Sequence, residues 1–152
     1  MNSNKKVMPP VSAIERSDID RKVLAWLNTY PDLPVSVIKT EPQLQVNVAG
    51  MALSAITTAY YSKRFIYGGY QAEYSFKIIY RIRPGDSAFA RMEALELLNL
   101  MGDWCARNKP DFGENLRVVG VVPTSPADLY APYEGGDEDY FINMKLTYES
   151  VK

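Results

Sequence analysis

The densest group of chemically active side chains lies in an acidic loop near the carboxyl end of the sequence. Four carboxylates fall within six residues, around a pair of glycines: Glu134, Asp137, Glu138 and Asp139. Hard cations such as Ca²⁺ prefer several carboxylate oxygens as ligands, which makes this loop a candidate cation site. Its spacing differs from that of an EF-hand, and a solvated glycine-rich turn explains the same composition. We therefore expect no metal and no cofactor.

Two further carboxylates, Glu93 and Glu96, are one helical turn apart, which is a spacing that an acid–base pair can use. No glycine-rich phosphate loop accompanies them, and a solvated helix face is the simpler interpretation. The sequence contains no histidine and a single cysteine, Cys105. These counts exclude Ser-His and Cys-His nucleophiles, histidine metal ligands and a cysteine zinc site. The composition predicts a protein that is not an enzyme.

Aromatic and basic side chains are concentrated between residues 60 and 83. Six of the 11 tyrosines fall within 21 residues there, with lysines and arginines between them. This mixture is typical of a platform for single-stranded nucleic acid, of a protein–protein interface, or of an ordinary tyrosine-rich hairpin. The net charge of −1, from 17 basic and 18 acidic residues, disfavours nucleic acid. An interface and a plain sheet both stay open.

The length of 152 residues is typical of a single domain, so we expect one domain over residues 1–152, and the order of the elements predicted below makes it an α+β domain. No apolar run reaches the roughly 18–20 residues of a membrane span. The N-terminus lacks the apolar segment of a secretory signal, so we expect a soluble protein inside the cell. Residues 1–12 contain the pair Pro9–Pro10 and are expected to form a flexible arm.

Two amphipathic helices are predicted. The first spans about residues 18–29, with Ser17 as its N-cap, and ends before Pro31. The second spans about residues 87–108 and begins at Asp86 or Ser87. Helical spacing defines its buried stripe: Ala94, Leu97, Leu98, Met101, Trp104 and Cys105. The opposite stripe is expected to be polar.

The remaining elements are strands. A long antiparallel hairpin over about residues 60–83 turns at Gly68–Gly69, and its second arm alternates apolar and polar residues. Further strands are expected at residues 35–38, 116–122 and 140–148, with a long polar loop at 123–139. Residues 43–59 show no clear pattern and are interpreted as strand and loop, with a helical turn at 51–56 as an alternative. The result is an antiparallel sheet packed against two helices.

Four segments resemble small phage and prophage proteins described as minor capsid or tail-completion proteins of Gram-positive hosts. The segments are residues 18–34, 51–81, 91–104 and 136–149, and the likeness covers about residues 18–149. It is sharpest from Ala59 to Arg83 and from Glu93 to Trp104. That group is similar in size and element order to the tail terminators of long-tailed phages, which are α+β proteins.

The resemblance implies a tail terminator, a hexameric ring that caps the tail tube, stops its polymerisation and offers a surface to the head or neck. The implied partners are further copies of the chain, the tail-tube protein and a head–tail connector. DNA would pass through the ring without specific binding, and assembly would take place in the host cytoplasm before the protein joins the virion tail. A head-completion or connector protein is the alternative, and a small transferase-type enzyme is a third.

A closed ring needs two different contact patches on each subunit. The predicted patches are the tyrosine-rich hairpin and the acidic loop, which faces either the channel or the neighbouring subunit's basic strand. The candidate interface residues are Tyr61, Lys63, Arg64, Phe65, Tyr67, Tyr70, Arg81, Glu134, Asp137, Glu138 and Asp139.

Overall fold

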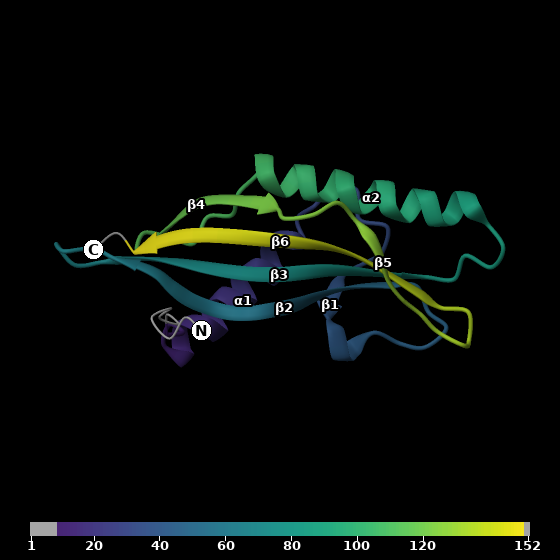
Figure 1. The fold of residues 1–152 in the computed structure, drawn as a ribbon, viewed down its shortest axis with the longest axis horizontal. Helices are drawn as coiled ribbons and strands as arrows, with labels where there is room; N and C mark the ends of the chain where they lie inside the picture. Colours follow the sequence, from purple (N-terminus) through teal and green to yellow (C-terminus); the bar gives the residue numbers. More distant parts are fainter. Residues whose placement is uncertain (1–8, 151–152) are drawn as a thin grey trace, which may run out of the picture.

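The structure, a computed structural model, describes residues 9–150 (Figure 1). Its elements in chain order are α1 (Ala13–Leu27), β1 (Ile38–Thr40), the 3₁₀ helix η1 (Glu41–Gln43), β2 (Gly50–Arg64), β3 (Tyr70–Ile82), α2 (Ala88–Arg107), β4 (Leu116–Pro123), β5 (Asp128–Pro132) and β6 (Glu138–Ser150). The predicted α+β class, with a mostly antiparallel sheet and two main helices, is confirmed. Neither α-helix in residues 9–150 is long and apolar enough to span a membrane.

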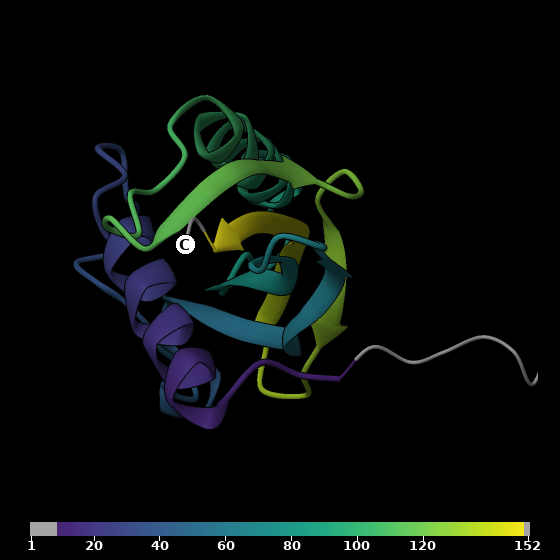
Figure 2. The ribbon, with the colours of Figure 1, turned by 90° about the vertical axis from the view of Figure 1, so that its left-hand side faces the viewer.

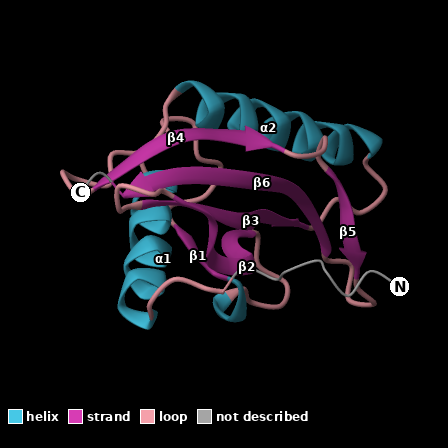
Figure 3. Ribbon diagram, turned by 60° about the vertical axis from the view of Figure 1, so that its left-hand side comes forward, coloured by secondary structure: helices cyan, strands magenta, loops and turns pink. Residues whose placement is uncertain are grey.

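The sheet has the strand order β1-β2-β3-β6-β4, and β5 pairs with the part of β6 that β4 leaves free (Figure 3). Every pairing is antiparallel except that of β1 with β2. The central strand β3 pairs with β2 on one side and with β6 on the other along nearly its whole length. This three-strand ladder forms the long axis of the molecule.

One face of the sheet supplies the core and carries both helices (Figure 2). Alternate residues of β3 and β6 are buried on this face, as the apolar alternation predicts: Tyr74, Phe76, Ile78, Tyr140, Ile142, Met144, Leu146 and Tyr148. From α1, Asp20 accepts a hydrogen bond from the Tyr74 hydroxyl (2.8 Å). The helices also meet each other, because the rings of Trp26 and Trp104 stack with 5.7 Å between centroids.

Helix α1 begins earlier than predicted. The Ser12 hydroxyl accepts a hydrogen bond from the Glu15 amide (3.2 Å), so Ser12 and not Ser17 is the N-cap. The expected flexible arm is wrong for residues 9–12, since the Val11 amide donates to the Ala59 carbonyl (3.0 Å) and Val11 is buried. Residues 1–8 of that arm lie outside the described residues.

Strand β2 is the largest correction, because residues 50–59 continue the hairpin that was predicted to begin at residue 60. The alternative of a helical turn at residues 51–56 is also wrong. The register between β2 and β3 shifts at three places between Ala55 and Lys63, and each shift breaks the alternation of apolar and polar residues. Before these shifts, Met51, Ala52 and Leu53 are buried one after another, so neither part of β2 shows a clear period of two in the sequence.

Two smaller corrections concern β1 and β5. A strand was predicted at residues 35–38, whereas β1 begins at Ile38 and ends at Thr40. The segment 123–139, predicted as a loop, contains β5, which continues the sheet edge beyond β4. In α2, the predicted N-cap Ser87 accepts a hydrogen bond from the Ala90 amide (3.1 Å). The predicted stripe is buried except for Leu97 and Trp104, which are half-buried.

Replacing Trp104 with Ala tests the contact between the helices. The change removes a ring that stacks on Trp26 and meets the edge of Tyr30 at 5.3 Å, so Trp104→Ala should lower the free energy of unfolding by about 3 kcal/mol. Chemical denaturation measures this. Leu100→Ala, on the exposed side of the same helix, is the control and should change stability by less than about 0.5 kcal/mol. Equal stability of both variants would contradict the packing role.

Candidate interaction surface

The β2–β3 hairpin projects beyond the body at one end of the molecule (Figure 1). In its closing loop the Phe65 amide donates to the Gly69 carbonyl (3.2 Å), and the Gly68 amide donates to the Phe65 carbonyl (3.1 Å). Gly68 and Gly69 have φ values of +91° and +82°, a conformation in which a side chain would be strained. The predicted two-glycine turn is therefore confirmed.

The end of this hairpin is aromatic, apolar and basic. We call the following residues the hairpin tip: Lys63, Arg64, Phe65, Ile66 and Tyr67. Ile66 is fully exposed and Tyr67 is 83% exposed, while the Phe65 and Tyr67 rings stack at 5.4 Å and are nearly parallel. The Arg64 guanidinium lies 4.2 Å from the centre of the Tyr61 ring. Exposed aromatic and arginine side chains in one patch are typical of binding hot spots.

Tyr61 and Tyr70, also predicted as interface residues, lie at the base of the hairpin tip and are half-buried. Their rings meet edge to face at 4.8 Å. The Tyr70 hydroxyl donates to Glu15 of α1, and the Tyr148 hydroxyl donates to the other oxygen of the same carboxylate (2.6 Å). Burial, followed by the hydrogen bond to Glu15, raises the pKa of both Tyr70 and Tyr148 above the ordinary value. Both tyrosines stay neutral; Tyr70 anchors the hairpin to α1, and Tyr148 anchors the neighbouring strand β6 to the same carboxylate.

The acidic loop contains a nearly buried ion pair. Arg81 donates two hydrogen bonds to the Asp139 carboxylate, at 2.7 and 2.9 Å, and the Tyr133 hydroxyl donates a third at 3.0 Å. The side chains of Arg81 and Asp139 are only 11% and 3% exposed. The hydrogen bond to Asp139 raises the pKa of Arg81, so its charge is permanent. Arg81 and Asp139, both predicted as interface residues, are thus paired with each other inside the chain and expose little surface.

The next two carboxylates of the loop are also occupied within the chain. Asp137 accepts hydrogen bonds from the Asn47 amide (2.9 Å) and from Arg83 (3.0 Å), and these contacts lower the pKa of Asp137. Glu138 pairs with Arg91 of α2 at 2.9 Å, and this hydrogen bond lowers the pKa of Glu138.

Only one of the four loop carboxylates, Glu134, is exposed, and Asp137 is 3% exposed. Because arginines of β3, α2 and the segment between them hold the other three, the loop does not present a patch of unpaired carboxylates to a neighbouring subunit. Within residues 9–150 no group of acidic, cysteine or histidine residues has the arrangement of a metal site. Three of the four acidic residues predicted for the interface thus form ion pairs within the chain, and we call these three arginine–carboxylate pairs the clasp.

A second exposed surface was not found from the sequence. The side of α2 that faces away from the sheet is apolar and acidic, and we call these residues the outer face of α2: Phe89, Met92, Glu93, Glu96, Leu100 and Asp103. Phe89 is 83% exposed, Met92 63% and Leu100 54%. The sequence contains this apolar signal at helical spacing, but a polar stripe is predicted on this side of the helix from Glu96, Asn99, Asp103 and Arg107.

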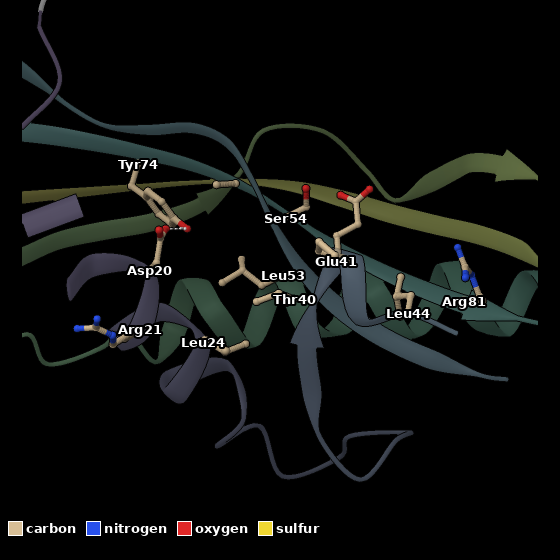
Figure 4. Close-up of a pocket in the computed structure, with 12 residues that line it drawn as sticks. Asp20, Arg21, Leu24, Thr40, Glu41, Leu44, Leu53, Ser54, Tyr74 and Arg81 are labelled. Atoms are coloured by element: carbon tan, nitrogen blue, oxygen red, sulfur yellow. Dashed lines mark hydrogen bonds between the residues drawn. The ribbon is translucent and has the colours of Figure 1, made fainter. Parts of the chain in front are cut away.

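An apolar hollow lies between α1, η1 and β2 (Figure 4). It has a volume of about 640 Å³ and is lined by Leu24, Leu44 and Leu53, with Asp20 and Glu41 at its rim. The Asp20 carboxylate accepts the hydrogen bond from Tyr74 described above. The hollow is therefore a shallow apolar groove in which a structural hydrogen bond holds one of the two carboxylates.

The sequence matches no protein-family model, and no curated protein matches it. What the geometry offers is a pair of exposed surfaces with opposite charge. The hairpin tip carries two basic residues beside apolar side chains, and the outer face of α2 carries three acidic residues beside apolar side chains. Such surfaces suit association with another protein better than chemistry on a small molecule.

Replacing Arg81 tests whether its ion pair acts within the chain. Arg81→Met leaves the Asp139 carboxylate buried with one hydroxyl partner, so the free energy of unfolding should fall by about 3 kcal/mol. The double variant Arg81→Met/Asp139→Asn should recover part of this loss. The exposed Lys39→Met is the control. Unchanged stability of Arg81→Met together with impaired association would contradict the internal role and return Arg81 to the interface.

Proposed function

We propose that this chain is a structural subunit of a phage tail, a tail terminator whose copies associate into a ring on the finished tail tube. The observation that carries the proposal is the hairpin tip, an exposed aromatic and basic surface that projects from the body. It lies within the segment Ala59 to Arg83, where the sequence most resembles phage tail-completion proteins. Six copies are the number that this resemblance implies.

The tip supports association because its side chains add nothing to the core of their own subunit. Ile66 and Tyr67 extend into water at the end of the hairpin. The stack of Phe65 on Tyr67 holds the aromatic surface in one shape before any partner binds. A preorganised surface loses less conformational entropy on binding, which favours a stable contact.

The proposed mechanism is steric and interfacial. One face of the ring complements the last ring of the tail tube, and the other face lacks the surface that a further tube ring needs. The near-neutral charge of the chain suits a conduit through which DNA passes without binding. Capping then stops polymerisation and leaves a surface for the head or neck.

Deleting the gene tests the role in the particle. Without a terminator, tail tubes should grow to uncontrolled lengths, because nothing caps the last ring; electron microscopy of lysates measures their length distribution. Complementation with the wild-type gene is the control and should restore one length. Tails of normal length that lack heads would contradict the proposal and assign the chain to the head–tail connector instead.

Changing the hairpin tip tests its role in association. Ile66→Ser/Tyr67→Ser should weaken self-association at least tenfold, because the apolar anchors are lost, and should leave the melting temperature unchanged because both side chains are exposed. Light scattering after size-exclusion chromatography gives the mass of the assembly. Ile56→Ser, on β2 of the same hairpin, is the matched control. Loss of stability with normal association would show that the tip is part of the folded core only.

A further inference from the structure

The outer face of α2 is an apolar surface that nothing else in residues 9–150 covers. Phe89, Met92 and Leu100 are more than half exposed, and helical spacing places them on one face of the helix. Isolated exposed apolar residues are normal on protein surfaces, whereas three on one helix face form a patch. The opposite side of α2 already packs on the sheet through Leu98 and Met101, so this patch is additional to the core.

The charge on this face has one sign. Glu93, Glu96 and Asp103 are exposed, and none of them forms an ion pair with another residue in the part of the chain that the structure describes. Arg91, the only basic residue of α2 before Arg107, is held by Glu138 of β6. The face therefore presents apolar side chains in a negative field.

The hairpin tip has the complementary character. Ile66 and Tyr67 supply exposed apolar surface, and Lys63 and Arg64 supply positive charge. No acidic residue occurs between Lys63 and Ala72. Apolar contact at the centre, with opposite charges around it, is the usual anatomy of a specific protein–protein interface.

The tip cannot reach the first turns of its own α2. β3 has 13 residues and rises about 3.3 Å per residue, so its two ends lie about 40 Å apart. The tip precedes β3, whereas Phe89 and Met92 follow its far end in the sequence. Figure 1 shows the turn of the β2–β3 hairpin and the start of α2 at opposite ends of the long axis. A contact between these surfaces must therefore join two copies of the chain.

We propose that the hairpin tip of one copy docks on the outer face of α2 of the next copy. The proposal rests on the proposed self-association and names the surface that receives the tip. The contact is heterologous, since each copy gives a tip and offers a helix, and a repeated heterologous contact closes into a ring when its rotation divides a full turn. Exposed charges lie at its rim, so salt above about 0.15 M should weaken association.

Charge reversal on each side tests this pairing. One variant carries Glu93→Lys/Glu96→Lys, and a second carries Lys63→Glu/Arg64→Glu. Each variant alone should lose association at least tenfold, because like charges then meet at every contact. An equal mixture should assemble again, since the acidic tip of the second variant meets the basic helix of the first. The native basic tip of the first variant likewise meets the native acidic helix of the second. Native mass spectrometry of each protein and of the mixture measures this.

The controls separate the pairing from folding and from the proposed function. Glu114→Lys/Asp128→Lys reverses two exposed carboxylates elsewhere and should leave association unchanged. Circular dichroism and thermal melts establish that each variant is folded. If the wild-type chain does not associate, the proposed function fails. If the wild-type chain associates but reversal on α2 has no effect, or the mixture stays monomeric, the pairing is overturned and self-association stands. Loss of tube binding alone would assign the α2 face to the tube protein and also overturn the pairing.

Discussion

Backbone pairing of β3 with β2 on one side and β6 on the other is the constraint on which the other features depend. Twelve residue pairs join β3 to β6 in one unbroken register, so every second side chain is committed to the core face. Because the same strand is paired along its whole length, the hairpin stays rigid as it leaves the body. The ladder thereby separates the tip from the start of α2 and makes the two surfaces available to different neighbours.

Electrostatics divides the charged residues into two groups. Arg81, Arg83 and Arg91 form pairs inside the chain with Asp139, Asp137 and Glu138, and these pairs close the end of the sheet opposite the hairpin tip. Asp137 and Asp139 are nearly buried, and without their arginines each carboxylate would keep only a neutral hydrogen-bond donor, the Asn47 amide or the Tyr133 hydroxyl, against its desolvation. The charges on the tip and on the outer face of α2 have no such partners in the described chain. The chain thus has nearly zero net charge and still presents two surfaces of opposite sign.

Regular periodicity decides how much of this could be predicted from the sequence. The second arm of the hairpin and β6 alternate apolar and polar residues with few exceptions, such as Ile79 and Phe141, and α2 keeps helical spacing along its length. These elements and the Gly68–Gly69 turn were therefore predictable. β2 was not, because its register shifts break the alternation. The ion pairs of the clasp could not be predicted either, because Arg83 and Asp137, for example, are 54 residues apart in sequence and only the fold of the sheet brings them together. Local patterns reveal elements, whereas charge pairing depends on which elements become neighbours.

The hairpin tip connects these points, because its shape is set before a partner arrives. Glu15 of α1 holds the hydroxyls of Tyr70 and Tyr148, so the base of the hairpin cannot swing against the helix. Tyr61 packs on Tyr70 and supports the Arg64 guanidinium, which extends this order toward the turn. A ring closes only when every subunit holds its contact at one fixed angle. A hairpin clamped at its base meets that requirement of the ring that we propose, whereas a flexible loop with the same residues would allow open chains of copies.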